Sequence, residues 1–139
     1  FGTERAQLIQ NTWIPLFTPP PPPPHLSPEE FGEMMKQNTE SHLERIRAAV
    51  DKVRARGGKV VFVRPPSTGR VRELEQQFSP RDRTWDLMLQ VTGAPGLHFE
   101  DHPELARFDC PEWSHLTAAD AVEFSRALMP LLAKALSES

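Results

Sequence analysis

The most regular hydrophobic pattern of the chain lies between residues 28 and 56. Apolar side chains recur there at helical spacing, and charged side chains fill the other face. Ser27-Pro28-Glu29-Glu30 combines a capping serine, a proline at the first helical position and the glutamate of a capping box. Gly57-Gly58 follows a basic last turn and is typical of a helix end. The pattern predicts one long helix, whose apolar face is formed by Phe31, Met34, Met35, Leu43, Ile46, Val50 and Val53.

A continuous apolar run, residues 60–63, follows this helix and ends before Pro65-Pro66. Because both of its faces are apolar, the run predicts a central strand of a parallel sheet. A helix, a glycine turn and a buried strand make half of a βαβ unit. Ligands of open α/β sheets bind beyond the carboxyl ends of the strands. We therefore expect Arg64 and the loop of residues 65–69 at the functional edge. A salt bridge from Arg64 to a neighbouring loop is favoured over contact with an anionic or carbonyl group.

Shorter elements follow. The charged stretch 70–78 predicts a short surface helix, and Ser79-Pro80 predicts the start of a second helix that ends at Gly93. Residues 97–99 predict a short strand, with an acidic segment at its carboxyl end. Together with the long helix and the first strand, these elements predict an α/β fold with a parallel sheet flanked by helices.

The carboxyl-terminal segment predicts a last helix. Thr117 is the expected cap and Asp120 the acid of its capping box. Pro130 is expected to kink this helix or to end its regular part near Leu128. The predicted inward face consists of Ala121, Val122, Ser125, Leu128, Met129, Leu132 and Leu136.

Residues 1–26 form a separate N-terminal segment in this prediction, and residues 27–139 form the α/β domain. A short helix is predicted from Glu4 to Thr12. The six consecutive prolines Pro19 to Pro24 must adopt an extended polyproline II conformation. A stiff spacer is favoured over a ligand for SH3 or WW domains.

Composition narrows the classes of function. The chain has 139 residues, a net charge of −3 and a pI near 6.0. It lacks a basic block for nucleic acid, and no apolar run has the length of a membrane-spanning helix. Cys110 is the single cysteine, so neither an internal disulfide nor a cysteine-pair metal site is expected.

The segment His98-Phe99-Glu100-Asp101-His102 contains several residue types that bind metals. Strand alternation would separate neighbouring side chains onto opposite faces, and no further ligand spacing follows. We therefore expect an acidic strand end rather than a metal site. His42 is likewise expected to be a surface or packed histidine of the long helix.

The segment from Cys110 to Thr117 offers the clearest candidate chemistry. Glu112 lies three residues before His115 on a loop that contains Pro111 and leads into the last helix. A histidine oriented by a carboxylate can act as a general base. The alternative is a histidine that only caps backbone groups near the sheet.

From residue 28 onward, the order of elements and the Glu112-Trp113-Ser114-His115 run resemble the carboxyl-terminal half of the SGNH (GDSL-type) hydrolases, bacterial members in particular. The resemblance implies a flavodoxin-like fold of which this chain holds the carboxyl-terminal part. It implies His115 as the catalytic base and Glu112, in place of the family's usual aspartate, as the acid that orients it. Asp109 is an alternative orienting acid.

The resemblance also implies a serine esterase or O-acyltransferase that needs no cofactor. Its substrate would be a small ester or an acylated carbohydrate, and a location outside the cytoplasm is compatible with the family. The chain contains no Gly-Asp-Ser and no Gly-x-Asn-Asp motif. We therefore expect an upstream segment of the same protein to supply the nucleophilic serine and to complete the sheet.

Two other functions stay open at this point. One is a catalytically incomplete SGNH-like domain that acts as a binding or interaction module. The other is a flavodoxin-like binding domain unrelated to hydrolases, for which the chain lacks a glycine-rich phosphate loop.

Overall fold

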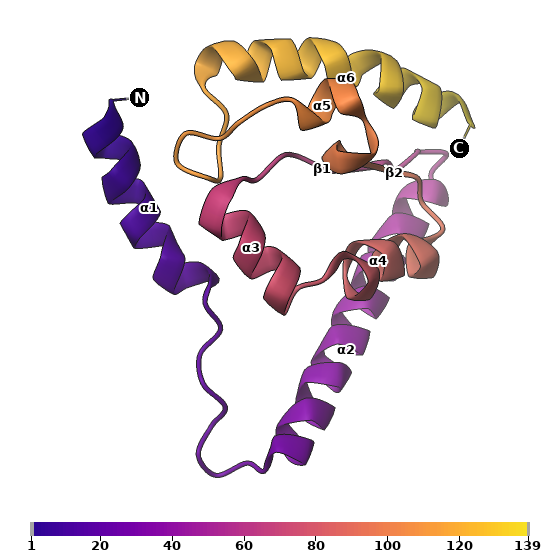
Figure 1. The fold of residues 1–139 in the computed structure, drawn as a ribbon. Helices are drawn as coiled ribbons and strands as arrows, with labels where there is room; N and C mark the ends of the chain where they lie inside the picture. Colours follow the sequence, from indigo (N-terminus) through magenta and orange to yellow (C-terminus); the bar gives the residue numbers. More distant parts are fainter. Residues whose placement is uncertain (1, 139) are drawn as a thin grey trace.

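The computed structural model describes residues 2–138, which form helices around a small parallel sheet (Figure 1). Helices and strands follow one another as α1 (Thr3–Phe17), α2 (Pro28–Arg54), β1 (Phe62–Arg64), α3 (Gly69–Phe78), α4 (Trp85–Thr92), β2 (Gly96–His98), α5 (Pro103–Ala106) and α6 (Ala118–Glu138). Short 3₁₀ helices, η1 and η2, occupy Arg81–Arg83 and Phe99–Asp101. Helices α5 and α6 lie on one side of the sheet, and α3 and α4 lie on the other (Figure 1).

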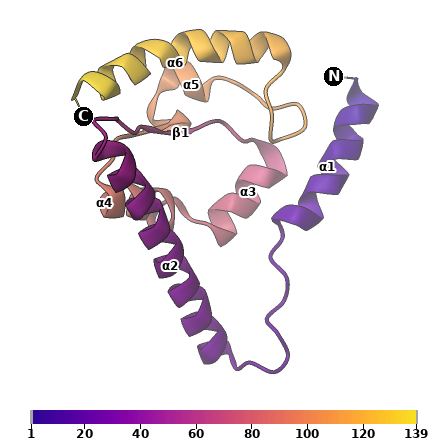
Figure 2. The same ribbon diagram turned by 180° about the vertical axis from the view of Figure 1, so that it is seen from behind.

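The predicted start of α2 is confirmed. The Ser27 hydroxyl accepts a hydrogen bond from the amide of Glu30, and the Glu30 carboxylate accepts one from the amide of Ser27. The amino-terminal half of α2 extends away from the sheet (Figures 1 and 2), and Met34 and Met35 are exposed there. Val50, near the other end, is the buried residue of this helix. The predicted apolar face thus reaches the core only at its carboxyl-terminal end.

The two strands are parallel, and Phe62, Val63 and Arg64 pair with Gly96, Leu97 and His98. Within residues 2–138, β1 pairs with β2 alone, so the prediction of a central strand is not confirmed. Val60 and Val61 lie outside the strand. The ladder with β2 starts at Gly96, and Pro95 before it has no N–H to donate, which accounts for the shorter strand. Residues 2–138 form a mixed α/β structure with a two-stranded parallel sheet, and the predicted flavodoxin-like fold is not confirmed in them.

The hydrophobic core lies between α6 and the segment that follows β2. Phe99, Leu105, Phe108 and Phe124 form its buried centre. The partly buried side chains packed against that centre are Leu116, Ala127, Leu128 and Leu131.

The predicted face of α6 was wrong in part. Phe124 was left out although it is the buried residue of this helix, whereas Val122 and Met129 are 50% and 59% exposed. The helix also continues through Pro130 to Glu138, so its regular part does not end near Leu128; the alternative, a kink at Pro130, stays a prediction. Pro130 lies on the exposed side, where water can bind the carbonyl that the proline leaves without a donor.

Two element boundaries between residues 79 and 99 also differ from the predicted ones. Ser79 does not cap α4, because the short helix η1 and the irregular backbone of Thr84 precede Trp85. Strand β2 ends one residue early, at His98, because Phe99 begins η2. Gly93 ends α4 in the left-handed conformation, as expected.

The N-terminal segment contributes a helix that packs against the rest of the protein, in addition to the predicted proline spacer. Helix α1 extends to Phe17, beyond the predicted end at Thr12, and packs against α3. The prolines lie in no helix or strand and lead the chain from α1 to the start of α2 (Figure 2). Residues 2–26 therefore place a helix beside the carboxyl end of the sheet.

Two loops are joined just beyond the carboxyl end of β1. The Thr68 hydroxyl donates to the carbonyl of Cys110 (3.1 Å) and accepts from its amide (3.3 Å). The amide of Thr68 donates to the carbonyl of Trp113 (3.0 Å). The indole of Trp113 lies against Gly69, whose φ of +54° is left-handed. A Cβ at Gly69 would lie 2.4 Å from that ring.

Replacing Gly69 therefore tests the contact between these loops. Gly69→Ala adds both backbone strain and a clash, whereas Gly57→Ala adds strain alone, since no atom lies within 4 Å of its added Cβ. We expect Gly57→Ala to lower the free energy of unfolding by about 1–2 kcal/mol. Gly69→Ala is expected to lower it by about 1–3 kcal/mol more. Denaturant unfolding of both variants measures the difference, and equal losses would contradict the packing of Trp113 on Gly69.

Candidate functional site

The side chain of Glu112 is buried beneath the loop that leads into α6, with 1% of its surface exposed. Its Oε2 accepts hydrogen bonds from the Ser114 hydroxyl (2.6 Å) and from the indole N–H of Trp13 (3.1 Å). Its Oε1 lies 2.9 Å from Nδ1 of His115. A buried carboxylate is tolerable when donors surround it in this way.

These contacts fix the tautomer of His115. A carboxylate can only accept, so Nδ1 of His115 must carry the hydrogen that binds Oε1 of Glu112. In the neutral imidazole, Nε2 then holds a free lone pair. The side chain of His115 is 67% exposed, and its hydrogen bonds within residues 2–138 are made by Nδ1. His115 therefore presents a basic nitrogen toward solvent.

The hydrogen bonds also set the charge of Glu112. Burial alone would raise the pKa of this carboxyl group, but the hydrogen bonds from Ser114 and His115 and the charge of His115 outweigh burial. The pKa of Glu112 consequently lies below its ordinary value of 4.5. The carboxylate is ionised at neutral pH, as the orientation of His115 requires.

The conformation of this loop buries the side chain of Glu112 and leaves that of His115 exposed. The amide of Trp113 donates to the carbonyl of Cys110 (2.8 Å), and Trp113 has a left-handed φ of 74°. Thr117 then accepts from the amide of Asp120 (3.1 Å), which confirms it as the cap of α6. His115 thus lies between a tight turn and a capped helix.

Sequence reasoning missed the contribution of α1. Trp13 donates to Glu112, and its ring lies 6.0 Å from that of His115. Gln10 donates to the carbonyl of Pro111 (3.1 Å). Nothing in the sequence links Trp13 to a residue 99 positions away, so only the tertiary structure shows this contact.

The Ser114 hydroxyl does not have the geometry of a nucleophile activated by His115. It donates to Glu112, and its oxygen lies 2.8 Å from Nδ1 rather than beside Nε2. Ser114 instead helps to hold the carboxylate and the imidazole in place.

The other sequence candidates fall outside this pair. Asp109, the alternative orienting acid, is exposed, and the described structure gives it no contact with His115. Arg64 forms a salt bridge, but its partner Glu75 (2.6 Å) lies in α3 and not in a neighbouring loop. His42 lies on the surface of α2 beside Arg45. Residues 2–138 contain no group of three His, Cys, Asp or Glu side chains arranged to hold a metal ion.

Cys110, beside the pair, is not suited to act as a nucleophile. The residue is buried, and its thiol donates to the carbonyl of Pro66 (3.5 Å). Burial and the nearby carboxylates of Asp109 and Glu112 raise the pKa of the thiol to about 11. The reactive thiolate is therefore scarce at neutral pH.

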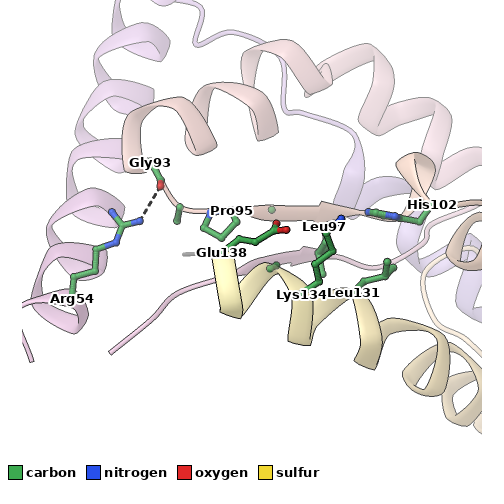
Figure 3. A pocket seen from close by; sticks show the side chains of 11 residues that line it. Arg54, Gly93, Pro95, Leu97, His102, Leu131, Lys134 and Glu138 are labelled. Carbon is green, nitrogen blue, oxygen red and sulfur yellow. Dashed lines mark hydrogen bonds between the residues drawn. The ribbon is translucent and has the colours of Figure 1, made fainter. Parts of the chain in front are cut away.

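A pocket of about 620 Å³ lies away from this pair, between the carboxyl-terminal ends of α2 and α6 and strand β2 (Figure 3). Arg54 at its rim donates to the carbonyls of Thr92 and Gly93 and so fastens α2 to the turn after α4. None of the residues that hold or orient His115 lines this pocket.

Comparison with protein-family models, with curated proteins and with solved structures finds no match for this chain. Among residues 2–138, no helix combines the length and the apolar character needed to cross a membrane. The geometry of Glu112 and His115 is therefore the main basis for a functional proposal.

The depressed pKa of Glu112 predicts how stability depends on pH. A carboxyl group with a lower pKa in the folded state stabilises the protein above the unfolded value, and this contribution is lost as pH falls through the folded pKa. Glu112→Gln removes the ionisation while keeping the shape. At pH 7 we expect the variant to be less stable by about 1–3 kcal/mol.

The difference in the free energy of unfolding between the wild type and Glu112→Gln should shrink as pH falls below 4.5. Denaturant unfolding of both proteins across this range measures it, and the subtraction removes the other titrating carboxylates. A difference that stays constant with pH would show that the charge of Glu112 does not stabilise the fold.

Proposed function

We propose that this chain supplies the acid and base of a serine esterase or O-acyltransferase of the SGNH type. The observation that carries the proposal is the contact between buried, ionised Glu112 and Nδ1 of His115, which leaves Nε2 exposed as a base. The resemblance of the Glu112-Trp113-Ser114-His115 run to that family and its position directly before the last helix support it.

The location agrees with this role. The loop of His115 is hydrogen-bonded to the loop that follows β1, so the pair lies at the carboxyl end of the parallel sheet. Active sites of open α/β sheets occupy this edge.

In the proposed reaction, Nε2 of His115 removes the proton from a serine hydroxyl as its oxygen attacks the ester carbonyl. The protonated imidazole then gives that proton to the departing alcohol. Water, deprotonated by the same nitrogen, releases the acyl group from the serine. Glu112 keeps Nδ1 protonated throughout and stabilises the charged imidazole.

The nucleophilic serine is proposed to come from a segment of the same protein upstream of this chain. Strand β1 offers a place for it, since its other edge has no strand partner within residues 2–138 and its three residues are only partly buried. An added parallel strand would extend the sheet toward the flavodoxin-like arrangement. The substrate class proposed from the resemblance is a small ester or acylated carbohydrate.

A catalytically incomplete binding module is the second candidate. It is favoured by one observation: within residues 2–138, no hydroxyl group hydrogen-bonds Nε2 of His115. The two candidates differ in whether a serine reacts.

The test uses the natural full-length protein with p-nitrophenyl acetate as substrate and a fluorophosphonate probe of reactive serines. We expect His115→Ala to lower turnover by roughly a thousandfold or more and to abolish labelling, because the serine loses its base. His42→Ala is the matched control, since His42 is exposed on α2 and distant in sequence from the pair. Circular dichroism checks that both variants fold.

Turnover that survives His115→Ala would contradict the catalytic assignment. A wild-type protein that neither turns over esters nor reacts with the probe would favour the binding module.

A further inference from the structure

A second cavity, of about 270 Å³, lies at the carboxyl ends of both strands, on the side covered by α3 and α4. Arg64 and His98 are the last residues of their strands and are paired in register, so their side chains lie on the same face. Both line this cavity, together with Arg72, Arg81 and the aromatic rings of Phe17 and Trp85. The proposed acid–base pair includes none of these residues.

His98 provides a fixed donor in this cavity. The residue is 2% exposed, and its Nδ1 accepts a hydrogen bond from the amide of Glu100 (3.3 Å). Burial and the neighbouring charge of Arg81 hold the pKa of His98 below its ordinary value of 6.5. The imidazole is therefore neutral at pH 7, and its hydrogen lies on Nε2.

The Nε2–H group of His98 has no acceptor among residues 2–138. All hydrogen bonds of His98 in the described structure are made by Nδ1. Yet no side-chain nitrogen or oxygen of these residues is both sealed from solvent and without a partner. Nε2 must therefore be reached from open space, and the cavity that His98 lines supplies it.

Three guanidinium groups surround the same space, and carboxylates fix each of them. Arg72 is bound by both oxygens of Glu100 (3.0 and 2.7 Å), and Arg81 by both oxygens of Asp101 (2.7 Å each). Neither of these carboxylates lines the cavity, so its wall presents the cationic side of both pairs.

Glu75 is the one acidic side chain of the lining. Its Oε2 accepts from both Arg64 (2.6 Å) and Ser67 (2.6 Å), so donors already occupy that oxygen. Arg81 is paired with Asp86 (3.2 Å) as well, and Arg72 lies 3.6 Å from Glu75, so each guanidinium group already has a carboxylate partner. What the wall offers a ligand is mainly hydrogen-bond donors, the guanidinium N–H groups and the Nε2–H of His98. A ligand that fits must bring acceptor oxygens.

We propose that this cavity binds a small carboxylate through the Nε2–H of His98 and the guanidinium groups of Arg64, Arg72 and Arg81. The volume of about 270 Å³ suits a small ligand, a carboxylate with a short body. Trp85 and Phe17 give it an apolar wall for a short hydrocarbon body. A single negative charge is favoured over two, because Glu75 repels a doubly charged phosphate about twice as strongly as a carboxylate.

The site lies close to the acid–base pair along α1. The ring of Phe17, which lines the cavity, is tilted against that of Trp13 (ring centroids 5.7 Å apart), and Trp13 contacts Glu112. The proposed carboxylate site nevertheless shares no residue with the acid–base pair. It holds or fails independently of the proposed esterase activity.

The test follows the imidazole signals of His98 by two-bond ¹H–¹⁵N NMR while propionate is added to the wild-type protein. Propionamide, which has the same shape without the charge, is the matched ligand control, and inorganic phosphate is the doubly charged one. We expect a saturable shift of the His98 signals with propionate and binding at least tenfold weaker for propionamide and phosphate.

A second measurement compares variants. His98→Phe keeps a ring but removes the donor, and it should weaken propionate binding by about tenfold to a hundredfold. His42→Phe on the surface of α2 should leave the affinity unchanged. The comparison of propionate with propionamide needs only the wild type, so it decides the question even if His98→Phe does not fold.

Three results would overturn the proposal. They are the absence of a saturable change at His98, equal binding of propionate and propionamide, and propionate binding by folded His98→Phe with wild-type affinity. Phosphate binding that is tighter than propionate binding would overturn the assignment to a carboxylate.

Discussion

The arrangement of the candidate site depends on one buried charge, the carboxylate of Glu112. Burying an ionised carboxyl group costs several kcal/mol unless donors surround it. Here the donors come from an indole, a hydroxyl and an imidazole. Each of these contacts also positions a part of the structure. Trp13 holds α1 against the loop that leads into α6, Ser114 holds that loop, and the contact with His115 orients its imidazole. A change that removed the charge would therefore loosen the N-terminal helix and free the histidine together.

The small sheet gives this charge its location. Its strands end side by side, and the loop after β1 holds the loop of Glu112 through Thr68, Cys110 and Trp113. The same sheet edge carries the cavity lined by His98 and Arg64. The Glu112–His115 pair and this cavity both lie at the carboxyl ends of the parallel strands, where side chains from several elements meet. Helix α1 then covers the edge and links the two through Trp13 and Phe17.

Local signals in the sequence predicted local structure well. The capping box at Ser27, the cap at Thr117 and the spacing of Glu112 and His115 depend on residues three positions apart, and the structure contains all three contacts. The failures are nonlocal. The apolar run around Val63 implied strands on both sides, yet a strand's neighbours are not encoded within it. The inward face of α6 depends on what the helix packs against, and so does the role of Trp13. The sequence favours an acidic strand end over a metal site around His98, but it assigns no role to His98, whose neighbours make it a neutral donor.

The most direct test of this account is the tautomer of His115, measured by two-bond ¹H–¹⁵N NMR of the wild-type protein at a pH where the imidazole is neutral. The ionised Glu112 can only accept, so we expect the hydrogen on Nδ1 and, for Nε2, the chemical shift of an unprotonated nitrogen. Glu112→Ala should remove this preference. An Nε2–H tautomer in the wild type, or a freely averaging ring that Glu112→Ala leaves unchanged, would contradict the claim that the buried carboxylate orients His115.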